Sequence, residues 1–386
     1  MNQAPVLPYA NRLIALHGMM GFTQYAIGFS IPLLKRDLEI SRVMASIHNI
    51  GWVLAVITLS ILIPRHIHKY PPHRLLRLGW ALTIIGIFGY CLGRTLWITV
   101  PSFTLCAIGA TIFNNTNSAT LGSHSGTAVK MMLRTVGISG LLGAISPTII
   151  GIFTRGGVEW RYTIILAAII LGSVALLMIP QIEMRDSSSG HSKKIIWDKS
   201  FLILVFFGFL TIWLETGTTT WSLDLLVDRG MTLRNAVLIV TAIGYFISLS
   251  RISFSFMSRV TTNFMWIFST TFMTLGLVII IAIRTPTLTF VGLLIAGFGL
   301  GPLNAIALAR SAASEQGPDV GIASFAIGMG PALGIAPWIM GWMSESIGFE
   351  WAYAFILLIL AIATYVYIYV DKNLSLIHIS EPTRPY

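Results

Sequence analysis

The stretch Gly157-Val-Glu-Trp-Arg-Tyr162 decides the fold, because it returns in the second half of the chain as Gly348-Phe-Glu-Trp-Ala-Tyr353. The two stretches begin 191 residues apart (348 − 157). A second set precedes each stretch at an offset of 190 residues (330 − 140), namely Gly140, Pro147 and Gly151, then Gly330, Pro337 and Gly341. Self-similarity at one offset indicates a duplicated unit. The sequence therefore predicts two similar halves.

Apolar runs long enough to cross a bilayer fill both halves. A helix rises about 1.5 Å per residue, so about 20 apolar residues cross a hydrocarbon core of about 30 Å. Twelve runs stand at 13–34, 45–64, 75–91, 96–119, 136–153, 162–179, 201–223, 236–256, 264–283, 288–309, 320–343 and 351–370. We expect an all-α membrane protein with twelve transmembrane helices in two pseudo-symmetric six-helix bundles.

The composition agrees with a membrane location. Of 386 residues, 55% are hydrophobic and 10% are charged, whereas soluble domains carry about 25% charged residues. The net charge of +10 does not indicate nucleic-acid binding, because the basic residues stand in short breaks between apolar runs. Cys91 and Cys106 lie inside apolar runs without metal-ligand spacing. We therefore expect no metal and no cofactor.

The chain divides at its longest internal polar stretch. Residues 181–199 read as a cytoplasmic linker between an N-terminal bundle, 1–180, and a C-terminal bundle, 200–373. Residues 374–386 match neither half and resemble the peptide obtained when a sequencing adapter is translated. We expect this tail to be non-native. An ordinary short disordered tail is the alternative.

The distribution of Lys and Arg sets the expected orientation. An even number of spans leaves both termini on one side. A cytoplasmic N-terminus places a modest excess of Lys and Arg inside and assigns Arg161 and Arg229 to external loops. We expect a multi-pass protein of the cell membrane, the inner membrane of a bacterium, with both termini cytoplasmic.

The break between the second and third runs carries a family resemblance. It reads His68-Lys-Tyr-Pro71-Pro-His-Arg74-Leu-Leu-Arg-Leu-Gly79, and it resembles the D-R-x-G-x-R-R-x-L motif of the major facilitator superfamily, with His68 at the Asp position and Pro71 at the Gly position. The chain resembles this superfamily over nearly its whole length. The resemblance implies a monomer that moves a small-molecule substrate by alternating access. It also implies that helices one, four, seven and ten line the substrate cavity.

One branch of the superfamily resembles the chain most. Glu215, Trp221 and Leu225 match the pattern E-x5-W-x3-L of the fucose/galactose/glucose permease group. This resemblance implies proton-coupled sugar uptake. The acidic residues that these permeases carry in their first and fourth helices are not evident here.

Glu215 is the acidic residue that lies well inside a predicted span. A carboxyl group in the bilayer is costly, and such residues are usually functional. We predict that Glu215 carries the coupling proton or binds substrate, while a protonated glutamic acid bonded to a neighbouring helix is the alternative. Thr218 shares its helix face. Trp221 could stack on a flat ligand, although tryptophan near the end of a span is commonly an interface anchor.

Polar residues in three other predicted spans complete the candidate site. His17 can shuttle protons near neutral pH, or it can be a neutral imidazole bonded to a helix carbonyl. Gln24 is a candidate for lining the cavity, because an amide facing lipid would lack partners. Asn114, Asn117 and Asn304 can bind ligand hydroxyls or join neighbouring helices.

These residues predict a transporter rather than an enzyme, because no nucleophile elbow or paired carboxylates are found. Proton-coupled uptake of a small polar, sugar-like solute is the leading interpretation. Proton-coupled efflux of amphipathic drug-like compounds is the alternative. A non-transporting membrane sensor is a second alternative, but it would need a signalling domain.

Overall fold

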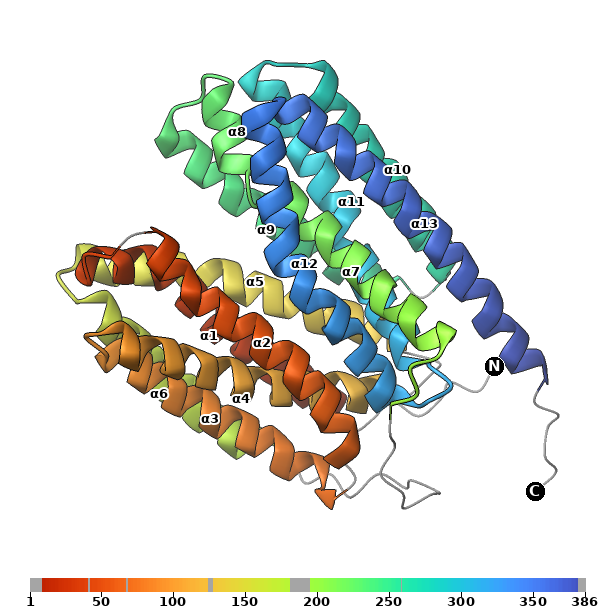
Figure 1. Ribbon diagram of the computed structural model, residues 1–386, viewed down its shortest axis with the longest axis horizontal. Helices are drawn as coiled ribbons and strands as arrows, with labels where there is room; N and C mark the ends of the chain where they lie inside the picture. The colour runs from red at the N-terminus through yellow and green to blue at the C-terminus, as the bar shows by residue number, and fades with distance from the viewer. Residues whose placement is uncertain are drawn as a thin grey trace. The chain divides into compact units, whose positions relative to one another are not determined.

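The computed structural model describes residues 9–40, 42–66, 69–123, 128–180, 195–257 and 259–380. The regular elements of these ranges are α-helices (Figure 1). The first half contains α1 (Ala10–Asp37), α2 (Arg42–His66), α3 (Pro72–Leu92), α4 (Leu96–Gly122), α5 (Ala128–Arg155) and α6 (Trp160–Met178). The second contains α7 (Lys199–Thr219), α8 (Ser222–Asp228), α9 (Leu233–Phe256), α10 (Thr262–Ala282), α11 (Pro286–Ala312), α12 (Pro318–Ser346) and α13 (Phe349–Ser380). The predicted all-α fold class is confirmed.

The chain folds into two compact units. The first comprises Met1–Lys194 with Arg251–Phe256, and the second comprises Ile195–Ser250 with Met257–Tyr386. The predicted bundle boundaries at 180 and 200 stay a prediction, because most of the linker 181–199 lies outside the described residues. His68 and residues 381–386 of the predicted tail also lie outside them.

Among the described residues, ten helices are long and apolar enough to cross a membrane, with α7 and α8 taken together as Lys199–Asp228. Helices α1 and α9 are not among the ten. Helix α1 has 28 residues, which span about 42 Å at 1.5 Å per residue, so its length is also sufficient. The multi-pass membrane architecture therefore agrees with the sequence prediction.

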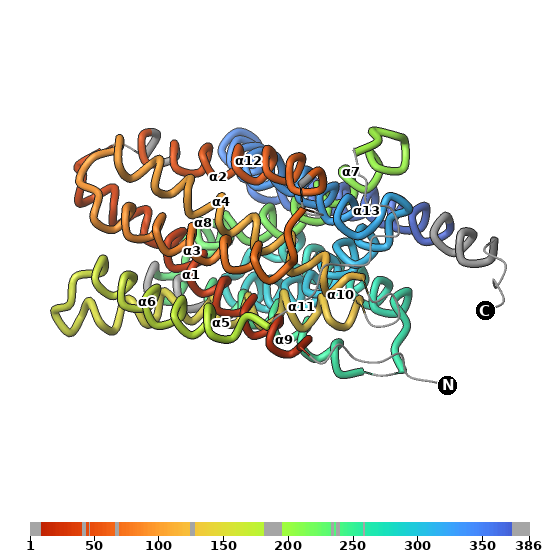
Figure 2. The backbone as a smooth tube through the Cα atoms, turned by 90° about the horizontal axis from the view of Figure 1, so that it is seen from below, coloured from red at the N-terminus to blue at the C-terminus, as the bar shows by residue number. Residues whose placement is uncertain are grey.

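The sequence repeat is also a repeat of helix packing. Helix α3 packs on α4 as α10 packs on α11, and α1 packs on α5 as α7 packs on α12 (Figures 1 and 2). A Cβ on Gly86 of α3 would lie 2.5 Å from the backbone nitrogen of Cys106 on α4. A Cβ on Gly276 of α10 would collide with the backbone nitrogen of Ala296 on α11. Both pairs of positions differ by 190 residues (276 − 86 and 296 − 106), so the two units share the same close helix contact.

The predicted run 201–223 is not one helix. Helix α7 ends at Thr219 and α8 begins at Ser222. Three β-branched residues, 218–220, precede the break and weaken helix propagation. The backbone of Trp221 is non-helical, with φ −102° and ψ 12°, and its indole Nε1 donates to the carbonyl oxygen of Pro337 on α12 at 2.7 Å. This bond holds the break between α7 and α8 against α12, at Pro337 and Gly341 of the repeated set.

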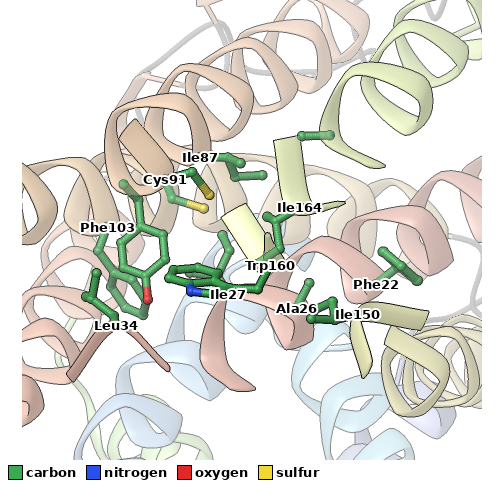
Figure 3. Close-up of a cluster of buried hydrophobic side chains, with 13 residues drawn as sticks. Phe22, Ala26, Ile27, Leu34, Ile87, Cys91, Phe103, Ile150, Trp160 and Ile164 are labelled. Carbon is green, nitrogen blue, oxygen red and sulfur yellow. The ribbon is translucent and has the colours of Figure 1, made fainter. Parts of the chain in front are cut away.

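A cluster of buried apolar side chains forms part of the core of the first unit (Figure 3). Ile27 of α1, Phe103 of α4 and Trp160 of α6 belong to it. The indole Nε1 of Trp160 donates to Asp37 Oδ2 at 2.9 Å. This hydrogen bond joins the last residue of α1 to the first residue of α6, which lies within the repeated stretch 157–162.

Candidate functional site

Glu215 and Asn304 face each other inside the second unit. Glu215 lies near the middle of the span Lys199–Asp228, and Asn304 lies on α11. Asn304 Nδ2 donates to Glu215 Oε2 at 2.9 Å. Both residues are half-buried. The structure therefore brings together two of the residues that the sequence predicts for the site.

The amide of Asn304 has a second polar atom that the protein does not use. Asn304 Oδ1 is buried and has no hydrogen-bond partner among the residues that the structure describes. A buried carbonyl oxygen without a partner costs about 1–3 kcal/mol. The position therefore suits a ligand that donates a hydrogen bond.

Thr218 and Trp221 lie close to Glu215 along the chain but have different surroundings. Thr218 is buried, and its carbonyl oxygen accepts from Tyr353 Oη at 3.1 Å. Its hydroxyl has no hydrogen-bond partner in the described ranges. The Trp221 indole N–H is taken by Pro337. A ligand-binding role for either residue stays a prediction.

His17 and Asn117 pair with each other inside the first unit. Asn117 Nδ2 lies 3.1 Å from His17 Nδ1 and 3.4 Å from the carbonyl oxygen of Leu13. With His17 Nδ1 accepting from the amide, a neutral ring carries its proton on Nε2. Both side chains are buried. This bond joins α1 to α4, and the predicted roles of His17 in proton coupling and of Asn117 in substrate binding stay predictions.

Gln24 and Asn114 occupy repeat-related positions in the first unit. Asn114 corresponds to Asn304 at the offset of 190 (304 − 114), and Gln24 corresponds to Glu215 at 191 (215 − 24). Both are half-buried. Asn114 Oδ1 is buried without a hydrogen-bond partner in the described part of the chain, as is Asn304 Oδ1. Among the described residues, each unit therefore presents an amide oxygen without a partner at the same position of the repeat. The repeat offset gives the correspondence of the two positions, and the structure of the described ranges shows that both oxygens are unpaired.

Arg161 has a structural position that the sequence does not predict. Its side chain is 2% exposed, although the sequence places it in an external loop. Arg161 Nη1 donates to the carbonyl oxygens of Cys91 at 2.7 Å and Gly93 at 2.9 Å, and its Nε lies 3.2 Å from Asp37 Oδ2. One guanidinium therefore ties the start of α6 to the ends of α3 and α1.

Arg229 also ties helix ends together in the second unit, although it does not occupy the position that corresponds to Arg161 in the repeat. Its Nη1 donates to the carbonyl oxygen of Ile283 at 2.9 Å and to Thr289 Oγ1 at 2.6 Å. Its Nη2 lies 3.5 Å from Glu350 Oε1. Ile283 corresponds to Gly93 at the offset of 190 (283 − 93). Burial lowers the pKa of Arg229 from its ordinary value, and Glu350 opposes this shift.

The described helices thus form duplicated bundles with membrane spans and polar pairs inside them. A model of the Major Facilitator Superfamily matches residues 13–314, which is more than half of the 386 residues. The chain belongs to the Major Facilitator Superfamily, whose members are transporters and not enzymes. The family predicted from the sequence is therefore confirmed. A comparison with curated protein sequences gave no match.

Solved structures of the same fold include several transporters. The fucose:proton symporter FucP of E. coli is 13% identical, covers 94% of this chain and 98% of its own, and has a TM-score of 0.76. The proton:xylose symporter XylE is 13% identical, with coverage of 94% and 96% and a TM-score of 0.71. The human organic anion transporter MFSD10 is 12% identical, with coverage of 93% and 100% and a TM-score of 0.72. At these identities the likeness concerns the fold.

Proposed function

We propose that this chain is a secondary active transporter that carries a small polar, sugar-like solute into the cell together with protons, by alternating access. The hydrogen bond between Asn304 Nδ2 and Glu215 Oε2 carries the proposal. A carboxyl group within a membrane span is costly and usually functional, and here it meets an amide with an unused acceptor. In this proposal both termini are cytoplasmic, the membrane is the bacterial inner membrane, and the transporter acts as a monomer.

Protonation of Glu215 changes what this pair offers to a ligand. An ionised carboxylate only accepts, so Asn304 meets it with Nδ2 and keeps Oδ1 for a ligand donor. A protonated carboxyl also donates, and the amide can then turn over, meet it with Oδ1 and keep Nδ2 for a ligand acceptor. Proton binding at Glu215 thereby alters the hydrogen bond that Asn304 makes with the solute.

A hydroxylated solute fits both states of the pair. A hydroxyl group donates one hydrogen bond and accepts two, so it can bind either atom of the Asn304 amide. Thr218 adds a hydroxyl one turn from Glu215 on α7. Asn114 and Gln24 provide the repeat-related amides of the first unit. Two transporters of the same fold are a fucose:proton symporter and a proton:xylose symporter, which supports this substrate class.

A ligand screen by thermal stability tests the proposal. A ligand at 100 times its Kd stabilises the native state by about 2.7 kcal/mol. We expect a sugar or polyol to raise Tm in the parent protein, and we expect Glu215→Gln to reduce that shift. Glu345→Gln is the matched control, because Glu345 is an exposed glutamate of α12, and it should leave the shift unchanged.

Two other outcomes would replace the proposal. If only lipophilic cations raise Tm, proton-coupled efflux of amphipathic compounds becomes the function, with Glu215 as the counter-charge. If a ligand binds but no net flux follows in proteoliposomes, the chain is a non-transporting sensor. Organic anions are included in the screen because MFSD10, an organic anion transporter, has the same fold.

A further inference from the structure

The first unit contains an apolar groove that the proposed function does not use. Its volume is about 590 Å³, and α1, α5 and α6 line it. Phe22, Leu142 and Ile149 lie on one side, and Tyr162, Leu166 and Ile170 lie along α6. The remaining lining residues are also predominantly apolar. Such a lining fits a hydrocarbon chain rather than a polar solute.

The groove has a firmly packed floor and an exposed edge. Phe22 belongs to the buried apolar cluster, together with Ile150 and Ile164 (Figure 3). Leu142 and Ile149 pack against that cluster. By contrast, Leu166 on the α6 side is 51% exposed. Because α5 and α6 are long and apolar enough to cross a membrane, we infer that lipid reaches this edge.

The length of the groove matches one leaflet of a bilayer. Its α6 side runs from Tyr162 to Leu171, which is about 13 Å at 1.5 Å per residue. Half of a hydrocarbon core of about 30 Å is about 15 Å. At one end the groove reaches Phe153 and Val158, beside the turn that joins α5 to α6. An acyl chain of that leaflet would therefore fill the groove from the membrane surface inward.

The end of the groove at the helix turn also carries groups that suit a lipid headgroup. Arg155 lies in the last turn of α5, two residues beyond Phe153, and it is exposed. Tyr162 is 58% exposed, whereas its repeat-related counterpart Tyr353 is buried and bonded to Thr218. An arginine at the membrane surface can bind the phosphate of an anionic phospholipid through charge-assisted hydrogen bonds.

We propose that this groove binds one anionic phospholipid, with an acyl chain between α1, α5 and α6 and the phosphate at Arg155. The site is separate from Glu215 and Asn304, which lie in the other unit. It does not depend on which solute is carried. The bound lipid covers an otherwise open apolar surface and stabilises the first unit.

Photo-crosslinking tests the site directly. The full chain is reconstituted with phosphatidylglycerol that carries a diazirine in one acyl chain, and the labelled peptides are mapped. We expect labelling concentrated in 142–153 and 162–171. Leu166→Trp should abolish this labelling by filling the groove. Leu177→Trp is the matched control on the same helix, at a side chain that is 88% exposed and outside the groove, and it should leave the labelling intact.

Native mass spectrometry supplies the second readout. The parent should retain one phosphatidylglycerol in preference to phosphatidylcholine. Arg155→Gln should remove this preference. In the absence of lipid, Arg155→Gln and Leu166→Trp should both have the Tm of the parent. Equal labelling of Leu166→Trp and the parent would overturn the proposal, because ordinary annular lipid would explain it. Loss of a dimer rather than of lipid in Leu166→Trp would also overturn it, since a second copy of the chain would then be the occupant.

Discussion

Asn304 Nδ2 donates to Glu215 Oε2 over 2.9 Å, and this bond joins α11 to α7 inside the second unit. The bond satisfies one oxygen of an embedded carboxyl group. It leaves the other atom of the amide, Asn304 Oδ1, buried without a partner among the described residues. A buried amide oxygen without a partner is costly in a membrane bundle. We therefore interpret it as the part of the second unit that a proton and a ligand complete.

Removal of the Asn304 amide should weaken ligand binding. The solute hydroxyl would form a neutral hydrogen bond with the amide, and such a bond contributes about 0.5–1.5 kcal/mol, so Asn304→Ala should raise the Kd of the identified ligand by about two- to tenfold. Isothermal titration of the purified protein measures this. Asn263→Ala is the control, because Asn263 accepts a hydrogen bond from Tyr367 Oη on a different helix pair. Equal losses in the two variants would mean that Asn304 acts through stability alone.

His17 should behave mainly as a structural residue. Its Nδ1 lies 3.1 Å from Asn117 Nδ2 in a buried position, and a buried group that loses its partner costs about 1–3 kcal/mol. We expect His17→Leu to lower Tm by several degrees and to leave the pH dependence of uptake unchanged. A displaced pH profile with an unchanged Tm would instead assign the coupling proton to His17.

Arg161 should be one of the most sensitive positions for folding. Its guanidinium is buried and contacts Asp37 and two backbone carbonyls. Without the guanidinium, two backbone carbonyl oxygens lose a donor, and a buried group left unpaired costs about 1–3 kcal/mol, so Arg161→Met should lower Tm strongly. Arg94→Met, at a side chain that is 66% exposed and 4.0 Å from Glu159, should change stability by less than about 1 kcal/mol. Similar Tm values for the two variants would contradict the assigned role.

The close contact that Gly299 makes between α11 and α10 should be sensitive to any added side chain. A Cβ on Gly299 of α11 would collide with the backbone of α10 at Met273 and Ser269. Because helix backbones cannot move apart cheaply, Gly299→Ala should cost about 1–3 kcal/mol. Gly334→Ala is the control, since a Cβ at Gly334 would meet nothing within 4 Å. Unfolding by denaturant in detergent compares the two, and equal stability would show that α10 and α11 are not packed as closely as described.

Most of the architecture follows from the sequence because apolar length and the repeat offset are strong signals. The start of α5 is an exception. The apolar run predicts a beginning at 136, whereas the helix begins at Ala128. Lys130 and Arg134 lower the hydropathy of these two turns without preventing a helix. The break after Thr219 was also not predicted, because it depends on the contact between Trp221 and Pro337.

The candidate residues could be chosen from the sequence, but not their partners. Embedded polar residues are few, so Glu215 and Asn304 stand out in apolar helices. Hydropathy does not reveal that Asn304 faces Glu215 while Asn117 faces His17. That choice depends on the rotation of α11 against α7 and of α4 against α1. The burial of Arg161 was also not predicted, because two of its acceptors are backbone carbonyls, which no side-chain pattern in the sequence marks.

Proton uptake driven by the identified solute tests the central proposal most directly. Proteoliposomes in weak buffer receive the solute, and the external pH is recorded for the parent, Glu215→Gln and Glu345→Gln. We predict alkalinisation of the medium with the parent and with Glu345→Gln, and none with Glu215→Gln, which should still exchange labelled solute across the membrane. Alkalinisation at the parent rate by Glu215→Gln would contradict the assignment of Glu215 as the group that binds the coupling proton.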